Sequence, residues 1–553
     1  MYSFFLFYLG VYVRRGCAMI QHTLQKCDPP ISEIDIYETS DLFCIYTCSN
    51  DGCNQHSYGD ILGYQTNLAR IFYGIPFAQA PINELRWNSP VPITKWFPKV
   101  INATSRAPAC PQPPCNPSSP LCPPHFSEDC LYLNIFTPLT TLASQSTPLP
   151  VMIFIPGGEF QHFDASASIY NAERLVNTTN VIVAFIQYRL GVLGFFATGT
   201  GPNDIKGNYG ILDQRLAIAW IKANINAFGG DPNEITLFGQ SAGAQSVALH
   251  YVARDMQSFF QRVIIQSAPM AIPFRTYAEY IIPGVFLAEQ LHCSFNDIAC
   301  FRAATVDNIT AAQEIVNGKI TSLEVLLFFE PWVPVIDNII VHGQLYETIQ
   351  NLSFPIKPLI MGTVTDEGLV FIYNKWNQPI LPKLYAEIAF AFFRGKALKV
   401  LERYPPVGEG DQRSLLSQIA TQWVFACPTR IFARKAALYS YVFGYPLNSD
   451  KKKNEDICNG HVCHGDELSY LFESNWINFT DAGQRVSQSI ANYWTNFAKT
   501  QNPNQPLSVP IQWPIGNNTY EKYMYFQDPL QVKDNYLEDD CDFWDQIGYR
   551  KDF

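Results

Sequence analysis

The chain has 553 residues, 47% hydrophobic and 16% charged, which suits a globular protein with a large core. Its 38 basic and 49 acidic residues give a net charge of −11, which disfavours nucleic acid and anionic membrane surfaces as partners.

The N-terminus begins with the apolar segment "MYSFFLFYLGVYV". It is long enough for a signal-peptide core and too short to span a bilayer, so we interpret residues 1–20 as a signal sequence. The alternatives are an uncleaved anchor and a misplaced start, because no basic residue precedes the segment. Residues 21–55 hold Cys27, Cys44, Cys48 and Cys53, which predict a cysteine-rich extension. No later apolar run is long enough to predict a membrane span.

Cysteines and glycosylation sequons indicate the compartment. The chain has 15 cysteines, several of them closely spaced, which favours an oxidising environment. The cysteines and the sequons together predict a secreted protein or one in the lumen of the secretory pathway. The sequons that we expect to carry glycans lie at Asn102, Asn177, Asn308, Asn351, Asn478 and Asn517.

Strand-like and helix-like segments alternate from about residue 130 onward. Residues 105–125, rich in proline and cysteine, predict a loop. Residues 153–155, 181–187 and 235–238 are short apolar runs typical of buried parallel strands, and residues 213–228 have helical spacing. This alternation predicts an α/β fold with a mostly parallel sheet. We expect one large domain over residues 56–547 and a short C-terminal tail over 548–553.

The first candidate for chemistry is the loop "FIPGGEFQ", residues 154–161, which follows an apolar run. Its paired glycines indicate a backbone that approaches another group closely. The second candidate is Gly239-Gln240-Ser241-Ala242-Gly243, which fits G-x-S-x-G between a strand-like and a helix-like run. Such a turn exposes the serine and offers free N–H groups at the helix start. A nucleophilic serine also needs a histidine base and an acid, and residue types alone leave open which ones.

Several separated motifs then resemble those of the type-B carboxylesterases, the group that includes cholinesterases and juvenile hormone esterases. The resemblance spans residues 58–547 and implies an α/β-hydrolase fold. The motifs are "FYGIPFAQAP" (72–81), "SEDCLYLNIFTP" (127–138), "YRLGVLGFF" (188–196), "DQRLAIAWIKANINAFGGDPNEITLFGQSAGA" (213–244), "MGTVTDEG" (361–368) and "HGDELSYLF" (464–472).

The resemblance implies a role for particular residues. Ser241 corresponds to the nucleophile, Glu367 to the acid and His464 to the base. The oxyanion would be bound by the backbone N–H groups of Gly158, Glu159 and Ala242. The implied activity needs no cofactor and no metal.

The same resemblance implies disulfides and structural ion pairs. It pairs Cys110 with Cys130, Cys293 with Cys300, and Cys427 with Cys541. Cys115 and Cys122 could close a further loop. Residues 458–464 could be misread as a zinc site, but a Cys458–Cys463 disulfide fits a secreted chain better, with His461 an ordinary loop histidine. The implied ion pairs are Arg86 with Glu128 and Arg189 with Asp213.

Three departures from the family pattern affect the expected substrate or the expected catalysis. Gln240 stands where cholinesterases have a glutamate, and the loop between Cys110 and Cys130 has no tryptophan, so we do not expect acetylcholine as the substrate. Pro156 and Glu159 replace a histidine and the third glycine of the oxyanion loop. A carboxylate there would oppose a developing oxyanion, so Glu159→Gly should raise kcat and Glu159→Gln should do so in part.

The sequence therefore predicts a serine carboxylic ester hydrolase that acts on uncharged, fairly apolar esters through an acyl-enzyme. The expected partner is a small-molecule ester. The alternative is a catalytically weak or inactive adhesion or storage protein on the same fold, as in neuroligin-like members, which Glu159 and the cysteine-rich extension favour.

Overall fold

The structure is a computed structural model. It describes residues 42–48, 57–96, 99–115, 119, 121–141, 147–323, 329–436, 439–447, 457–473, 479–516 and 521–549. The expected signal sequence, Cys17, Cys27, Cys53, Asn478, Asn517 and the tail from residue 550 lie outside the described residues.

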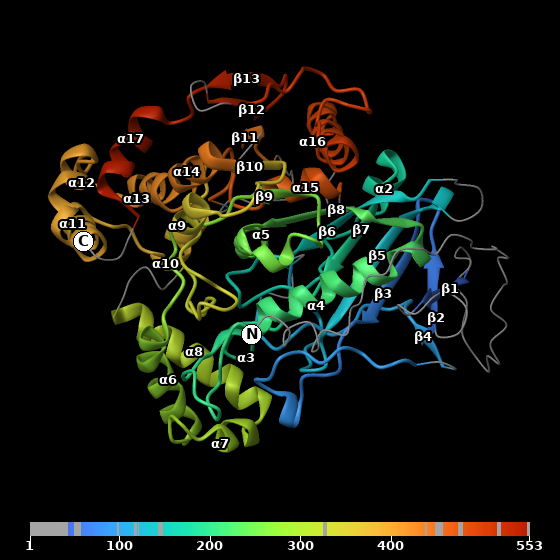
Figure 1. Ribbon diagram of the computed structural model, residues 1–553. Coiled ribbons are helices and arrows are strands. Elements are labelled where there is room, and N and C mark those ends of the chain that lie inside the picture. The colour runs from blue at the N-terminus through green and yellow to red at the C-terminus, as the bar shows by residue number, and fades with distance from the viewer. Residues whose placement is uncertain are drawn as a thin grey trace.

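A single mixed sheet of 13 strands runs through the molecule (Figure 1). Its strand order is β1-β2-β3-β5-β7-β6-β8-β9-β10-β11-β12-β13, with β4 beside β2. Pairing is parallel from β7 to β12 and antiparallel from β1 to β7 and between β12 and β13. The strands are β1 Leu42–Cys48, β2 Ser57–Gln65, β3 Ala69–Pro76, β4 Val100–Asn102, β5 Tyr132–Pro138, β6 Leu149–Ile155, β7 Ile182–Ile186, β8 Gly230–Gln240, β9 Arg262–Gln266, β10 Leu359–Val364, β11 Tyr439–Phe443, β12 Lys522–Phe526 and β13 Gln531–Asp534.

Helices cover both faces of this sheet, which confirms the α/β-hydrolase architecture (Figure 1). The helices are α2 Glu173–Thr179, α3 Gly191–Phe195, α4 Tyr209–Asn224, α5 Ala242–Val252, α6 Tyr277–Leu291, α7 Ile298–Ala303, α8 Val306–Leu323, α9 Leu345–Thr348, α10 Leu369–Lys375, α11 Pro382–Phe393, α12 Ala397–Arg403, α13 Arg413–Ala420, α14 Cys427–Ala436, α15 Asp466–Phe472, α16 Asp481–Thr500 and α17 Glu538–Ile547.

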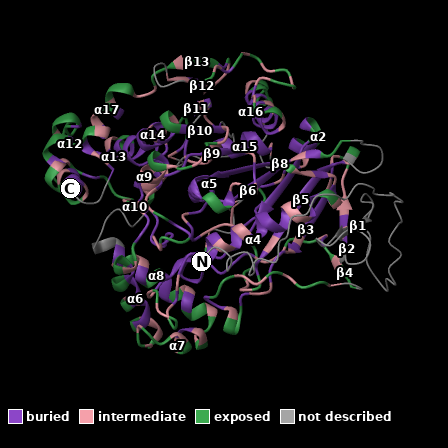
Figure 2. Ribbon diagram, in the orientation of Figure 1, coloured by how far each residue is buried: buried purple, intermediate pink, exposed green. Residues whose placement is uncertain are grey.

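Strand β6 shows why the central strands read as continuous apolar runs. Its residues Val151, Ile153 and Ile155 pack into one core cluster, and the alternate residues Met152 and Phe154 pack into another. Side chains of a strand point alternately to the two faces, so both faces of the sheet are buried here. Figure 2 shows this buried centre, with exposed residues on the outer helices.

Two boundaries differ from the sequence-based expectations. The helix expected over residues 213–228 begins earlier, at Tyr209, and ends at Asn224, where a 3-10 turn over Ile225–Phe228 continues the chain. Strand β1 pairs with β2, so the sheet already begins within the segment predicted as a separate extension. Local sequence patterns do not fix such ends, because helix ends depend on hydrogen bonding and edge strands on their partner.

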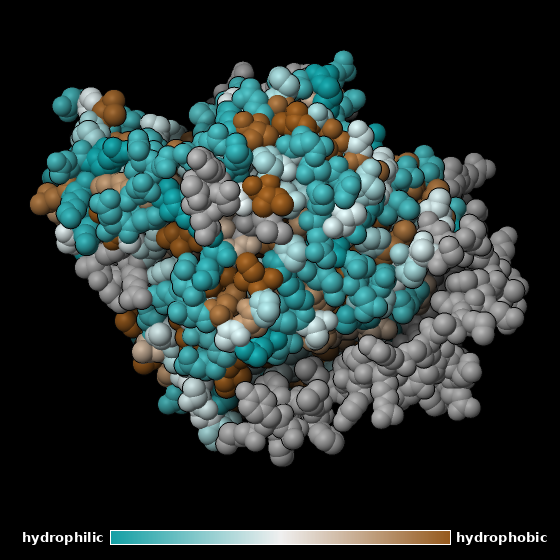
Figure 3. All heavy atoms as spheres, turned by 45° about the horizontal axis from the view of Figure 1, so that its top comes forward, coloured by the Kyte–Doolittle hydropathy of each residue, from teal (hydrophilic) through white to brown (hydrophobic). Residues whose placement is uncertain are grey.

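Within the described part of the chain, no helix is long and apolar enough to cross a membrane. On the face shown in Figure 3, hydrophilic residues predominate and hydrophobic residues form smaller separate groups.

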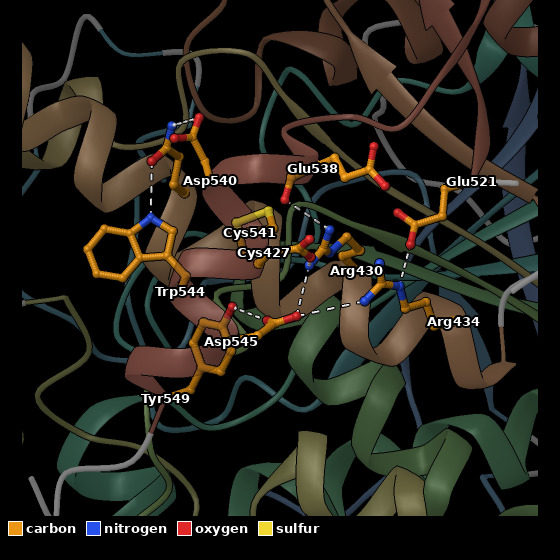
Figure 4. The surroundings of a disulfide bond; sticks show 12 residues. Cys427, Arg430, Arg434, Glu521, Glu538, Asp540, Cys541, Trp544, Asp545 and Tyr549 are labelled. Carbon is orange, nitrogen blue, oxygen red and sulfur yellow. Dashed lines mark hydrogen bonds and ion pairs between the residues drawn. A yellow bond between two sulfur atoms is a disulfide. The ribbon is translucent and has the colours of Figure 1, made fainter. Parts of the chain in front are cut away.

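The C-terminal helix α17 is fastened to α14 by the Cys427–Cys541 disulfide (Figure 4). Beside it, the nearly buried Arg430 reaches Asp542 at 2.7 Å and Asp545 at 2.8 Å. This connection joins segments 114 residues apart in the sequence. It therefore removes much more freedom from the unfolded chain than a short loop would.

Candidate active site

Ser241 occupies a sharp turn between β8 and α5. Its backbone has φ 60° and ψ −129°, a region that non-glycine residues rarely adopt. The flanking glycines permit the close approach: a Cβ on Gly243 would lie 2.0 Å from the Ile155 carbonyl oxygen, and one on Gly239 would lie 2.6 Å from that of Gly243. The sequence thus builds the strained elbow that the G-x-S-x-G pattern predicts.

The loop after β6 passes directly over this elbow. A Cβ on Gly157 would lie 2.9 Å from the Ser241 Cβ, so only glycine leaves room there. In the described part of the chain, no hydrogen bond uses the backbone N–H of Gly158 or Glu159. Ala242 is the first residue of α5, where the N–H has no partner within the helix. Three backbone N–H groups in the segments around the serine thus have no hydrogen-bond partner among the described residues, and their role as an oxyanion hole stays a prediction.

Glu159 keeps its N–H at a conformational cost. It has φ 57° and the next residue, Phe160, has φ 58°, both in the left-handed region that costs a non-glycine residue on the order of 1 kcal/mol. The Glu159 side chain is only partly exposed, and burial raises the pKa of its carboxyl to about 8. At neutral pH this carboxyl is therefore mostly uncharged, which weakens its expected opposition to an oxyanion.

Glu367 and His464 come together from different loops. His464 Nδ1 contacts Glu367 Oε2, and Glu367 Oε1 accepts a hydrogen bond of 2.9 Å from the Val364 N–H at the end of β10. Glu367 is fully buried, and the exposed fraction of the His464 side chain is 9%. The carboxylate therefore orients the imidazole, as in a serine triad.

The two loops are also bonded to each other. The Asp366 N–H donates to the Val462 carbonyl at 3.1 Å, and the Asp366 carboxylate accepts from the Val462 N–H at 3.1 Å. His461 Nδ1 lies 2.9 Å from the same carboxylate and is exposed. His461 thus pairs with Asp366, and His464 alone of the two contacts Glu367. The sulfurs of Cys458 and Cys463 form a disulfide, which leaves neither free to bind zinc.

The Gln240 side chain contacts the other ring nitrogen of His464. Its Nε2 lies 3.0 Å from His464 Nε2, and an amide nitrogen can only donate, so this ring nitrogen accepts. The ring proton is then on Nδ1, facing Glu367, which is the tautomer that a general base needs. Among the described residues, no hydrogen bond involves Ser241 Oγ. The structure thus joins Glu367 to His464, the residues expected to be the acid and the base, but Gln240 contacts the ring nitrogen with which the serine is expected to interact.

Aromatic rings surround the imidazole. The centroids of Phe371 and Phe425 each lie 5.1 Å from that of His464, and the Phe329 ring lies 5.3 Å from Phe371. Phe425 belongs to a π-helical segment, Thr421–Ala426, that interrupts the run from α13 to α14. Such segments often mark functional sites because they redirect side chains.

Two buried glutamates, Glu467 and Glu330, were not predicted from the sequence. Glu467 lies behind Glu367, accepts from Gln266 Nε2 at 3.2 Å, and has a pKa raised to about 8 by burial and by the Glu367 charge. Glu330 is 2% exposed, and neither carboxyl oxygen has a hydrogen-bond partner among the described residues. The available signal was a single acidic residue inside the apolar run "LLFFEPWVPV", residues 326–335.

The remaining predicted residues lie as follows. The five disulfides are Cys110–Cys130, Cys115–Cys122, Cys293–Cys300, Cys427–Cys541 and Cys458–Cys463, the pairs that the sequence analysis names. The ion pair Arg86–Glu128 closes at 2.6 Å and Arg189–Asp213 at 2.7 Å, both with little exposure. The sequons at Asn102, Asn177, Asn308 and Asn351 have exposed asparagines, which a glycan requires.

Comparisons with known proteins agree with this geometry. A family model described as the carboxylesterase family matches residues 53–544. The chain is 34% identical over 503 residues to the cAMP-regulated D2 protein of Dictyostelium discoideum, covering 89% of this chain and 92% of that protein. It is 34% identical over 515 residues to the crystal protein of the same organism, covering 90% and 92%. It is 30% identical over 522 residues to the acetylcholinesterase of Bungarus fasciatus, covering 86% and 82%.

Proposed function

The chain belongs to the carboxylesterase family, and we propose that it is an active serine esterase that hydrolyses carboxyl esters, chiefly uncharged and fairly apolar ones. The observation that supports this most is the contact of His464 with the buried Glu367, beside a strained Ser241 and three available backbone N–H groups. A protein selected only for adhesion or storage would not need to maintain this strained arrangement.

The proposed reaction uses only side chains and backbone of the chain. Ser241 Oγ attacks the ester carbonyl while His464 Nε2 takes its proton, and the N–H groups of Gly158, Glu159 and Ala242 stabilise the oxyanion. His464 then protonates the leaving alcohol. Water, activated by the same nitrogen, attacks the acyl-enzyme, and the carboxylic acid departs with Ser241 restored. The Nδ1–H of His464 donates to the Glu367 carboxylate throughout.

One rearrangement is required before this cycle. The Gln240 amide must leave His464 Nε2 so that the serine hydroxyl can donate to it. Gln240 packs beside two residues without side chains, because a Cβ on Gly157 would lie 3.1 Å from its Oε1 and one on Gly465 would lie 3.5 Å from its Nε2. A change of rotamer at Gln240 would release the histidine.

The substrate preference follows from the rings around His464. Phe329, Phe371 and Phe425 offer apolar surface next to the reacting group, and Gln240 carries no charge that would attract a cationic alcohol. Esters with apolar groups gain most from this surface. The five disulfides and exposed sequons support a secreted or secretory-pathway location.

A fluorophosphonate probe tests the proposal, because it labels only an activated serine. We expect stoichiometric labelling of the wild type at Ser241, none of Ser241→Ala, and hydrolysis of p-nitrophenyl esters that is lost in the same variant. A folded wild-type protein that is neither labelled nor able to hydrolyse any ester of a chain-length series would overturn it. That outcome favours the non-catalytic alternative, which the contact between Gln240 and His464 would then explain.

A further inference from the structure

The loop after β6 is strained at three positions. Glu159, Phe160 and Phe163 have φ of 57°, 58° and 74°, in the left-handed region, although none of them is glycine. Inside the loop, the chain turns back through two hydrogen bonds of 2.8 Å, both to the Gly158 carbonyl. These bonds do not attach the loop to the rest of the molecule. Since strained residues persist only where their surroundings impose the conformation, the attachment must come from elsewhere.

The side chain of Gln161 makes the first attachment, to α8. It is buried, and its Oε1 accepts from Gln313 Nε2 at 3.1 Å and from Asn317 Nδ2 at 2.8 Å. The Val192 N–H, which can only donate, bonds Gln313 Oε1 at 2.8 Å. The Trp332 indole N–H, also only a donor, bonds Asn317 Oδ1 at 2.8 Å. Both α8 amides must therefore direct their NH₂ groups at the oxygen of Gln161.

Gln112 makes the second attachment, from the loop that the Cys110–Cys130 disulfide closes. This side chain is buried too, and its Oε1 accepts from the Phe163 N–H at 2.8 Å. Its Nε2 donates to the Phe163 carbonyl at 3.0 Å and to the Cys110 carbonyl at 3.1 Å. One amide thus holds both backbone groups of the third strained residue.

Both attachments act on the part of the loop that touches the expected oxyanion donors. A Cβ on Gly158 would lie 2.3 Å from the His162 carbonyl oxygen and 2.8 Å from the Phe163 ring, so these backbone segments are in contact. His162 lies between the two attached residues in the chain. Movement of this segment would therefore displace the N–H groups of Gly158 and Glu159. Such donors stabilise an oxyanion only when they are already placed about 3 Å from it.

We propose that Gln161 and Gln112 are positioning residues, which hold the strained loop so that the N–H groups of Gly158 and Glu159 face the oxyanion. The inference rests on the proposed esterase function and deepens it, since it gives α8 and a disulfide-closed loop a part in the reaction. Neither side chain needs to touch the ester. Because the oxyanion forms only in the transition state, loss of either side chain should lower kcat and leave KM nearly unchanged.

A catalytic experiment measures this effect. Substitution by methionine removes the amide and keeps the length of the side chain. In Gln161→Met and in Gln112→Met, kcat for p-nitrophenyl butanoate should fall at least about tenfold, with a change in KM of less than about threefold. A trifluoromethyl ketone, which forms a tetrahedral adduct with an oxyanion at the serine, should lose at least about tenfold in affinity in the same variants.

Gln412→Met is the matched control. Gln412 is buried just before α13 and holds both backbone groups of one residue: its Oε1 accepts from the Val407 N–H at 2.7 Å, and its Nε2 donates to the Val407 carbonyl at 3.0 Å. Its Nε2 also donates to the Gly410 carbonyl at 2.8 Å. The variant therefore removes as many hydrogen bonds as Gln112→Met does. It should lower the melting temperature but change kcat by less than about threefold.

Hydrogen exchange tests the attachment without chemistry. The backbone N–H groups of Gln161, His162 and Phe163 each donate a hydrogen bond. In Gln161→Met, the peptide over residues 154–163 should exchange at least about tenfold faster than in the wild type. Gln161→Glu keeps an oxygen for both α8 amides and should exchange at the wild-type rate, as should Gln412→Met.

The outcomes separate the two proposals. If the wild type hydrolyses esters and both methionine variants keep kcat within about threefold, or raise KM instead, the positioning role is wrong. If no ester is hydrolysed and the fluorophosphonate does not label Ser241, the esterase function fails. In that case faster exchange in Gln161→Met still supports the attachment of the loop, whereas unchanged exchange overturns it.

Discussion

Glu159 should make the proposed esterase activity fall at alkaline pH. Its carboxyl has a pKa of about 8, because burial disfavours the charged form. It is then about 10% ionised at pH 7 and about 90% ionised at pH 9. The ionised form places a negative charge beside the oxyanion that the Glu159 N–H is expected to bind.

The size of the effect follows from Coulomb's law. A glutamate carboxylate lies on the order of 6 Å from its own backbone N–H, and an effective dielectric constant of about 20 gives about 3 kcal/mol of repulsion. That corresponds to a decrease of kcat/KM by roughly 100-fold at full ionisation. The rate increase that the sequence suggests for Glu159→Gly should thus be small at pH 7 and large above pH 8.

The assay is kcat/KM for a short p-nitrophenyl ester between pH 6 and 10, corrected for spontaneous hydrolysis. The wild type should lose activity above pH 8, whereas Glu159→Gln and Glu159→Gly should not. The charge of Glu159 also acts on the pKa of Glu330, and Glu330→Gln should retain the alkaline loss. An alkaline loss that persists in Glu159→Gln, or its absence from the wild type, would refute the reasoning.

Three further predictions concern the base, the acid and the disulfides. Gln240→Met removes the amide donor and keeps the side-chain length. Labelling of Ser241 by fluorophosphonate should become about 5-fold faster, because a hydrogen bond of about 1 kcal/mol to His464 is lost. Slower labelling would contradict the view that Gln240 blocks His464. Glu367→Gln should lower kcat by about 10³–10⁴-fold with little change in the melting temperature, because the buried carboxylate orients His464. A decrease of kcat by less than tenfold would exclude that role. Replacing Cys427 and Cys541 by alanine should lower the free energy of unfolding, measured in urea, by about 4–5 kcal/mol. Replacing Cys458 and Cys463 should lower it by only about 2 kcal/mol, because that disulfide closes a loop of 5 residues and the first one of 114. Equal losses would contradict the loop-entropy account.

Much of the site could be read from the sequence because its motifs are local. G-x-S-x-G fixes a turn through the glycines on either side of Ser241, and close backbone contacts of those glycines are what the structure shows. The order of Ser241, Glu367 and His464 along the chain likewise depends on the topology of one fold. The choice of His464 over His461 required the resemblance, and the structure shows its geometric basis, since His461 turns to Asp366 and His464 to Glu367.

By itself, the sequence determined the alternation of strands and helices, the elbow around Ser241 and the glycine-rich loop after β6. Each depends on backbone preferences and apolar spacing within a few residues. Only the tertiary structure decided that Gln240 Nε2 lies 3.0 Å from His464 Nε2 and that burial raises the pKa of Glu159 to about 8. The first property depends on two side chains 224 residues apart, and the second on how completely water is excluded around a carboxyl, which no local pattern encodes.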